Sequence, residues 1–211
     1  MASRRAAFQL RSHWVTWGIL AVLVGAPALE GQGPRTRTTP EAVHGLQSRP
    51  TTLSPSSGPP GTAVTVRGAF LPAITPVQVA LGGTQSGFEA LRLVLTNREG
   101  ELEEIVEIPA WAKRDRAHRF IIFDAYFSPL SASPLFHVTD ENGILVRQGQ
   151  VEERSSTCLI LRGDDEERYI LQGVDRELAV GDVVVVEGRL GESSTCGDGL
   201  ILQVTSLTPG G

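Results

Sequence analysis

"TAVTVRG" (Thr62–Gly68) is a stretch in which apolar and polar side chains alternate, and it decides the class of fold. Alternation with a period of two places successive side chains on opposite faces of a β-strand. Similar runs follow it, namely VQVALGG (Val77–Gly83), LRLVLT (Leu91–Thr96) and LEEIVEIP (Leu102–Pro109). The runs are short and separated by glycine-containing or polar turns, which is typical of an all-β protein.

Two further runs complete this first series. RFIIFDAYF (Arg119–Phe127) is expected to be a strand with Phe123 and Phe127 in the core, and LFHVT (Leu135–Thr139) closes the series. A series of short strands at this spacing predicts an immunoglobulin-like sandwich over residues 51–140. The Cys–Trp–Cys arrangement of antibody domains is missing, so no relation to antibodies is implied.

A second β series occupies residues 141–211, with the runs ILVRQGQVEE, CLILR, RYILQG, VVVVEGRL and LILQVTSL. The spacer VDRELAVGD (Val174–Asp182) lies between the third and fourth runs and predicts a short helical turn. Five strands with one short helix at this place follow the order of the OB-fold, so a small five-stranded OB-like barrel is predicted. Gly188 in the fourth run favours a bend or bulge where the barrel closes.

The opening of the first series resembles a known family. LSPSSGPPGTAVTVRGAFL (Leu53–Leu71) is similar to the start of IPT/TIG domains, which are immunoglobulin-like modules of many surface and exported proteins. The chain differs from many bacterial versions at Lys113–Asp115, where a Pro-Gly turn is usual. Residues 141–211 resemble an uncharacterised family of OB-like domains in exported bacterial proteins, and this resemblance implies no function. The residues that match the IPT/TIG signature are Pro55, Gly58, Gly61, Thr62, Val64, Gly68 and Phe70.

The N-terminus has the pattern of an export signal. Three arginines precede the apolar run Val15–Val24, and small residues typical of a cleavage site follow at Ala26–Ala28. The apolar run is shorter than the roughly 20 residues of a membrane span. We therefore expect residues 1–28 to be a cleaved signal peptide, and the protein to be periplasmic or extracellular without a membrane span. An uncleaved anchor is the alternative, and residues 29–50 are expected to be a flexible linker.

The charge of the chain is unevenly distributed. Removal of residues 1–28 takes away three arginines and no acid, which leaves 16 basic and 24 acidic residues. Residues 140–211 contain 14 acids and six arginines and so carry the whole net charge of −8. OB-folds that bind single-stranded nucleic acid use a basic groove and stacking aromatics. The second module is acidic and has one aromatic residue, Tyr169, so nucleic acid is not expected as a partner.

Both cysteines, Cys158 and Cys196, lie in copies of the sequence SSTC. A zinc site needs four ligands and a catalytic cysteine needs a neighbouring base, and residues 140–211 contain no histidine. Two cysteines in an exported protein favour a disulfide, with free buried thiols, a metal site or a nucleophile as the alternatives. In the chain-entropy model, a disulfide that closes the loop between these two cysteines would stabilise the module by about 4 kcal/mol.

The two SSTC copies fall between the first and second and between the fourth and fifth predicted strands. These loops are neighbours at the ligand-binding end of an OB-fold, so we expect the disulfide to tie that mouth together. The bond would hold a binding surface rigid or would only close a small barrel. Trp111 in the first module is either an exposed platform for sugar stacking or a cover over the sandwich edge. The candidate ligand surface comprises Ser155, Thr157, Ser193, Thr195, Asp198, Tyr169 and Trp111.

The chain shows no recognised catalytic motif: it lacks G-x-S-x-G, H-E-x-x-H, a P-loop and G-x-G-x-x-G. The acidic run Asp164–Glu167 is either a solvated hairpin tip or a weak Ca²⁺ site, and no metal or cofactor is assigned to the protein. We predict an exported, non-catalytic binding or interaction module of the bacterial cell envelope, with an envelope protein or glycan as partner. The alternatives are a small secreted hydrolase or accessory enzyme with a carboxylate site, and a purely structural spacer.

Overall fold

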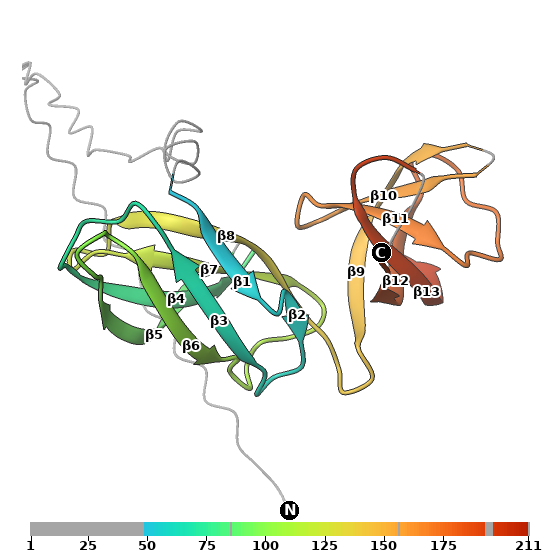
Figure 1. Ribbon diagram of the computed structural model, residues 1–211. Coiled ribbons are helices and arrows are strands. Elements are labelled where there is room, and N and C mark those ends of the chain that lie inside the picture. Colours follow the sequence, from blue (N-terminus) through green and yellow to red (C-terminus); the bar gives the residue numbers. More distant parts are fainter. Residues whose placement is uncertain (1–48, 85, 156, 193–195, 211) are drawn as a thin grey trace, which may run out of the picture. The chain divides into compact units, whose positions relative to one another are not determined.

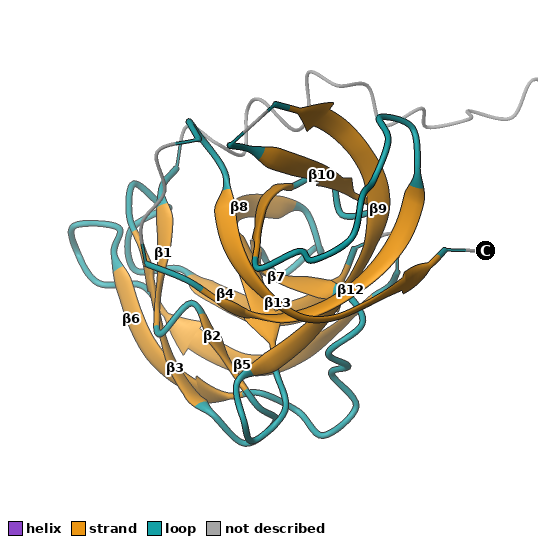
Figure 2. Ribbon diagram, turned by 90° about the vertical axis from the view of Figure 1, so that its right-hand side faces the viewer, coloured by secondary structure: helices purple, strands orange, loops and turns teal. Residues whose placement is uncertain are grey.

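The computed structural model describes residues 49–84, 86–155, 157–192 and 196–210. Every regular element in these ranges is a β-strand, and Figure 2 accordingly shows strands joined by loops. The predicted all-β class is therefore confirmed. The expected signal peptide and nearly all of the expected linker lie outside the described residues. Within the described residues, no helix has the length and hydropathy that a membrane crossing requires.

Residues 51–138 form a sandwich of two sheets (Figure 1), as predicted. The smaller sheet has the order β1-β3-β6 and consists of β1 (Thr51–Ser54), β3 (Ala63–Gly68) and β6 (Leu102–Glu107). The larger sheet has the order β2-β8-β7-β4-β5 and consists of β2 (Ser57–Gly58), β8 (Pro129–Val138), β7 (Ala117–Phe123), β4 (Pro76–Gly83) and β5 (Phe88–Leu95). All neighbouring strands are antiparallel except β2 and β8, which are parallel.

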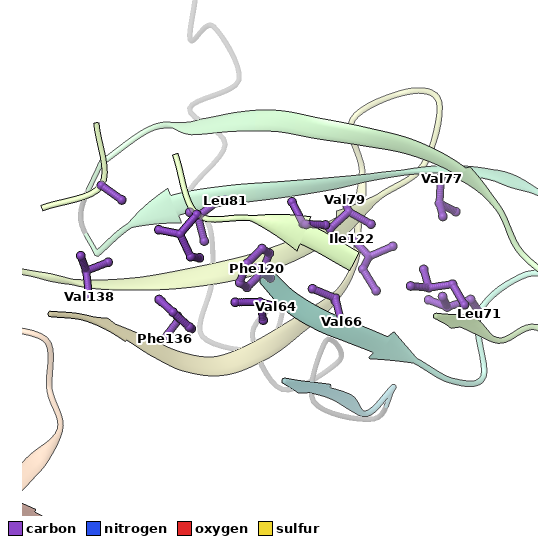
Figure 3. Packing of buried hydrophobic residues seen from close by; sticks show 14 residues of the cluster. Val64, Val66, Leu71, Val77, Val79, Leu81, Phe120, Ile122, Phe136 and Val138 are labelled. Atoms are coloured by element: carbon purple, nitrogen blue, oxygen red, sulfur yellow. The ribbon is translucent and has the colours of Figure 1, made fainter. Parts of the chain in front are cut away.

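The core of the sandwich lies between the two sheets (Figure 3). Val64 and Val66 of β3 are fully buried and alternate with more exposed neighbours, as the sequence pattern predicts. From the larger sheet, Phe120 and Phe136 meet edge to face, with ring centroids 6.3 Å apart. Burial of these large apolar surfaces is the main force that holds the two sheets together.

The chain turns immediately after β7, where the sequence pattern predicts that the strand continues. The side chain of Asp124 accepts hydrogen bonds from the backbone N–H groups of Tyr126 and Ser128, both at 2.8 Å. Phe127 has a φ of 59° and its side chain is 57% exposed, so its predicted place in the core is wrong. An aspartate that satisfies backbone donors two and four residues ahead stabilises a turn in competition with a strand.

Residues 144–209 form a closed five-stranded barrel. Its strands are β9 (Ile144–Arg154), β10 (Leu159–Gly163), β11 (Arg168–Gln172), β12 (Val183–Leu190) and β13 (Leu200–Pro209). The order β10-β11-β13-β12-β9 closes because β9 also pairs with β10, and β11 and β13 are the one parallel pair. Five strands connected in this way confirm the predicted OB-like barrel.

The predicted helical turn between β11 and β12 is wrong, because no helix forms in this connection. Instead, Leu178 inserts into the barrel core as part of an irregular segment. The backbone N–H of Ala179 donates to the side chain of Asp182 at 2.8 Å, and the chain reverses at Gly181, which has a φ of 98°. A single helical turn restricts the backbone of several residues and gains only one hydrogen bond, so it is unfavourable by itself. Here the apolar contact of Leu178 closes the barrel end without a helical turn.

Gly188 lies at a bulge in β12, as its position in the sequence predicts. The register with β13 shifts between Glu187 and Gly188. A Cβ atom on Gly188 would lie 2.4 Å from the carbonyl oxygen of Gln203, so only glycine allows the two strands to approach this closely. The bulge bends β12 where the barrel closes.

Candidate functional site

A disulfide joins two loops of the barrel. The Sγ atoms of Cys158 and Cys196 lie 2.08 Å apart and their Cα atoms 5.6 Å apart. Cys158 lies in the connection between β9 and β10, and Cys196 in the connection between β12 and β13. The predicted disulfide is therefore confirmed, and it ties together the two loops that flank the ligand-binding end of OB-folds.

Two hydrogen bonds join the described ends of the first of these loops. The backbone N–H of Ser155 donates to the carbonyl oxygen of Cys158 at 2.8 Å, and the N–H of Cys158 donates to the hydroxyl of Ser155 at 3.0 Å. The side chains of Ser155 and Thr157 are exposed beside the disulfide.

A groove with a volume of about 360 Å³ begins at this loop. It continues past the end of β11 into the connection between β11 and β12. Its size is at the lower end of the range for sites that bind small molecules. The described residues that line it are Arg154, Ser155, Thr157, Cys158, Leu159, Leu171, Gln172, Gly173, Val174, Arg176 and Leu178.

The charged groups that line the groove are both arginines. Arg154 is held in place, because its guanidinium donates to Glu177 at 3.0 Å and to the carbonyl oxygen of Leu178. Arg176 is exposed and makes no hydrogen bond or ion pair within the part of the chain that the structure describes. The other five arginines of the barrel all have polar partners. The groove thus offers an unsatisfied cation in a module that is otherwise strongly acidic.

The structure brings only part of the predicted ligand surface together. Ser155 and Thr157 line the groove. Asp198 is exposed in the second loop but does not line the groove, and Ser193 and Thr195 lie outside the described residues. Sequence reasoning missed Arg154, Gln172 and Arg176. The net negative charge of residues 140–211, taken as a whole, concealed this local cationic site. The available signal was that Arg154 directly follows the first predicted strand of the barrel and Arg176 follows the third.

Tyr169 is not part of any ligand surface, and this expectation is corrected. Its side chain is completely buried in the barrel core. The hydroxyl accepts a hydrogen bond from Nε of Arg147 at 2.8 Å and donates one to Oδ2 of Asp165 at 2.6 Å. Burial raises the pKa of Tyr169, and the carboxylate of Asp165 raises it further. The ring of Tyr169 therefore packs in the barrel core, and its hydroxyl is hydrogen-bonded to two buried charged groups.

Asp165, one of the four acidic residues of the run Asp164–Glu167, has a structural role. Its Oδ2 atom lies 3.1 Å from Nε of Arg147, and its Oδ1 atom accepts the backbone N–H of Glu167 at 3.2 Å. This carboxylate is thus the counter-ion of a buried arginine rather than an outward-facing ligand for Ca²⁺. Among the described residues, no group of three or more His, Cys, Asp or Glu side chains is placed to hold a metal ion.

Arg147 also reaches residues of the sandwich. Its guanidinium lies 2.9 Å from Nδ1 of His137 and donates to the carbonyl oxygen of Arg114, also at 2.9 Å. Because a guanidinium only donates, Nδ1 of His137 is the acceptor and its proton is on Nε2. Burial, helped by the charge of Arg147, lowers the pKa of His137 to about 3.

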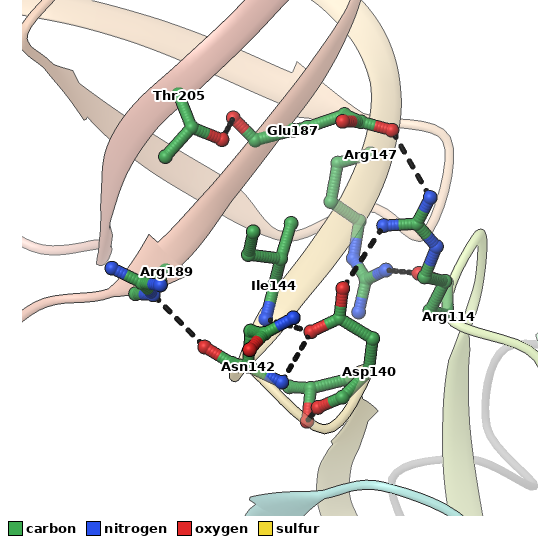
Figure 4. A network of polar contacts seen from close by, with 9 residues as sticks. Arg114, Asp140, Asn142, Ile144, Arg147, Glu187, Arg189 and Thr205 are labelled. Atoms are coloured by element: carbon green, nitrogen blue, oxygen red, sulfur yellow. Dashed lines mark hydrogen bonds and ion pairs between the residues drawn. The ribbon is translucent and has the colours of Figure 1, made fainter.

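Arg114 and Asp140 extend this network along the connection between β8 and β9 (Figure 4). The guanidinium of Arg114 lies 3.2 Å from Glu187 of β12 and 3.7 Å from Asp140. The backbone N–H groups of Ile144 and Asn142 donate to Asp140 and, with Arg114, lower the pKa of its carboxyl group. Arg114 belongs to the connection between β6 and β7, and this connection contacts the barrel.

Trp111 lies in the sandwich and does not line the groove. Its side chain is 40% exposed, and its ring centroid is 5.7 Å from that of His118. His118 is buried, and its Nδ1 atom has no hydrogen-bond partner among the described residues. Burial lowers the pKa of His118 to about 4, so the neutral ring serves as a packing surface for Trp111.

A larger depression, of about 500 Å³, lies on the sandwich. The one cation that lines it, Arg67, lies 2.9 Å from Glu103, and the carboxylate of Glu101 accepts a hydrogen bond from the neutral amide of Asn97 at 3.3 Å. The only cation of this depression is therefore already paired, and we regard the groove beside the disulfide as the stronger candidate. No model of a known protein family matches this chain, and no curated protein is detectably similar to it in sequence.

Proposed function

We propose that this chain is an exported, non-catalytic binding module of the bacterial cell envelope, with its ligand site in the groove beside the Cys158–Cys196 disulfide. The observation that carries the proposal is the unpaired guanidinium of Arg176 in a groove of about 360 Å³. An unpaired cation in a groove with exposed hydroxyl and amide groups favours an anionic, hydrogen-bonding ligand. Export rests on the N-terminal sequence pattern, with which the disulfide is compatible.

The ligand that best fits this chemistry is a glycan that bears carboxylate groups. Arg176 would pair with a carboxylate, while Gln172 and Thr157 would bond to neighbouring hydroxyl groups. Val174 and Leu159 are half-buried in the groove and offer apolar surface for the less polar face of a sugar ring.

The test is binding of the purified exported protein to an array of uronate-bearing and neutral glycans. We expect binding to the acidic glycans, and we expect Arg176→Gln to weaken it by about tenfold, the effect of losing one charge-assisted hydrogen bond. Arg98→Gln is the matched control, because Arg98 is also exposed, makes no polar contact within the described residues and lies in the sandwich.

Two outcomes would contradict the proposal. One is equal binding by the Arg176→Gln variant and the native protein. The other is hydrolysis of the array glycans by the native protein, which would favour the alternative of a secreted hydrolase. The pKa of Asp140 is lowered, which is the opposite of what a general acid requires, and no observation on the described residues favours that alternative.

A further inference from the structure

We propose that a second copy of this chain pairs with the open edge of β5, so that two sandwiches join through antiparallel β5 strands into a two-fold dimer. An edge strand presents unpaired N–H and C=O groups and is a template for another strand. β5 lies at the end of its sheet, and β4 is the only strand that pairs with it in the part of the chain that the structure describes (Figure 1).

The other three edges of the sandwich are protected against such pairing. β1 has four residues and β2 only two, which is too short for a stable ladder. β6 has three glutamates among its six residues, and like charges oppose pairing with a second copy. The barrel is closed and has no free edge of this kind.

β5 has neither form of protection. It is eight residues long, contains no proline and has one residue of each charge, Glu89 and Arg92. The side chains of Leu93 and Leu95 are 72% and 62% exposed. Exposed apolar side chains on a long edge strand are unfavourable in water unless another molecule covers them.

The register of β5 against β4 determines which side chains would meet. Val79 pairs with Arg92 and Ala80 pairs with Ala90, so Leu91 is the extra residue of a bulge. Val79 belongs to the sandwich core, which places Arg92 on the inner side of the sheet. By the same alternation, Glu89 lies on the inner side and Phe88, Ala90 and Leu93 lie on the outer side.

Antiparallel pairing about a two-fold axis at Ala90 satisfies this pattern. If the bulge residue Leu91 of each copy stays unpaired in the new ladder, as it is against β4, each Glu89 lies opposite Arg92 of the second copy and each Phe88 opposite Leu93 of the second copy. The two opposite-charge pairs and two apolar pairs are favourable cross-strand combinations, and the small Ala90 lies on the axis. Arg92 remains available for this contact, because its side chain is 61% exposed and lies 3.8 Å from its present partner, Glu104.

The distribution of charge favours the same surface. Residues 29–139 contain ten acidic and ten basic residues, whereas residues 140–211 carry a net charge of −8. Two copies that meet through the neutral sandwich avoid the repulsion that contact between two acidic barrels would cause.

The first test is analytical ultracentrifugation of the purified protein over a range of concentrations. We expect a monomer–dimer equilibrium that Leu93→Lys weakens by about tenfold or more. Ile105→Lys is the matched control, since Ile105 is a similarly exposed apolar residue of β6 and its replacement is expected to leave the dimer unchanged. The variants Glu89→Arg and Arg92→Glu are each expected to weaken the dimer, and their combination to restore it.

The second test is covalent capture of the dimer. Paired residues in antiparallel strands have Cα atoms about 4.5–5.5 Å apart, a separation that a disulfide can span. Ala90→Cys is therefore expected to form a cross-linked dimer on mild oxidation, whereas Glu107→Cys on β6 is not. This test decides the question if Leu93→Lys changes the thermal unfolding of the sandwich.

Three results would overturn the proposal: a monomer at all concentrations, a dimer that Leu93→Lys and the charge reversals leave intact, and an Ala90→Cys variant that does not cross-link. Occupation of β5 by a strand of a different protein, with this chain monomeric, would overturn it as well. None of these results depends on glycan binding at the groove, so the two proposals fail separately.

Discussion

Arg147 and Asp165 form an ion pair in the interior of the barrel. Nε of Arg147 lies 3.1 Å from Oδ2 of Asp165, and the two side chains are only 2% and 3% exposed. Removing two charges from water is unfavourable unless they are paired and hydrogen-bonded. Here the hydroxyl of Tyr169 bonds to both partners, and His137 and a backbone carbonyl satisfy the rest of the guanidinium.

Replacement of the arginine alone is expected to damage the barrel severely. Arg147→Met leaves Asp165 as a buried charge without a partner and should lower the free energy of unfolding by about 3–5 kcal/mol. Urea denaturation monitored by circular dichroism measures this change. Arg162→Met is the control, because Arg162 forms an exposed ion pair with Glu152 and its loss should change the free energy by less than about 1 kcal/mol.

The cause can be separated from simple loss of packing. The triple variant Arg147→Met, Asp165→Leu, Tyr169→Phe replaces the whole network by apolar groups and should recover much of the lost free energy of unfolding. If the triple variant is less stable than Arg147→Met alone, the uncompensated charge is not the reason for the loss.

The buried histidines make stability depend on pH. A histidine in the unfolded chain titrates near its ordinary pKa of 6.5, whereas the pKa of folded His137 is about 3. Between these values the unfolded chain binds the extra proton, so stability is full above pH 6.5 and falls as the pH is lowered toward 3. The expected contribution of His137 to the slope is about 1.4 kcal/mol per pH unit.

His137→Asn isolates this contribution. The Oδ1 atom of asparagine accepts a hydrogen bond at the position of Nδ1 and does not titrate. Free energies of unfolding measured between pH 7 and pH 4 should show a smaller slope for His137→Asn than for the native protein. His118, with a pKa of about 4, remains in both and cancels in the difference. Identical slopes would contradict the assignment.

The disulfide should stabilise the barrel and shape the groove. It closes a loop with a sequence separation of 38 residues, for which the chain-entropy model gives about 4 kcal/mol. The free energy of unfolding of the double variant Cys158→Ser, Cys196→Ser, measured by urea denaturation, should be lower than that of the native protein by this amount. A reductant should not change the stability of the double variant. A mass measurement that finds two free thiols in the purified exported protein would contradict the bond.

Gly100 allows a close approach that another residue would prevent. Its φ is 73°, and a Cβ atom would lie 2.1 Å from the carbonyl oxygen of Leu71. Gly143 has a similar φ of 75° with open space around the missing Cβ atom. Gly143→Ala should therefore lower stability by about 1–2 kcal/mol, the effect of the left-handed backbone alone.

Gly100→Ala combines the same backbone effect with a clash against the main chain. It should lower stability by on the order of 2 kcal/mol more than Gly143→Ala does. Thermal and urea unfolding of the two variants measure the difference. Equal losses would mean that the backbone around Leu71 moves aside at little cost.

The sequence runs predicted β3 to β13, because burial of one strand face is a local pattern. They did not predict β1 and β2, whose four and two residues are too short to show an alternation. The order of the barrel and the bulge at Gly188 followed from spacing and from a single glycine in a strand. Phe127 was misplaced because the turn-forming bonds of Asp124 compete with a pattern that reads as a continuing strand. The helical turn was wrong because one leucine, Leu178, fills the barrel end without helix formation.

The sequence by itself determined two β-modules and their order, since these depend on local periodicity. It also determined the pairing of the two cysteines, since the chain contains no third cysteine with which either could pair. Only the tertiary structure decided that Tyr169 and Arg147 are buried, that Arg176 lines a groove without a partner and that β5 is an open edge. The physical reason is that burial and pairing of a charged or aromatic side chain depend on strands that are distant in the chain. Closure of the barrel places Asp165 beside Arg147, and sheet order alone leaves β5 without a second neighbour.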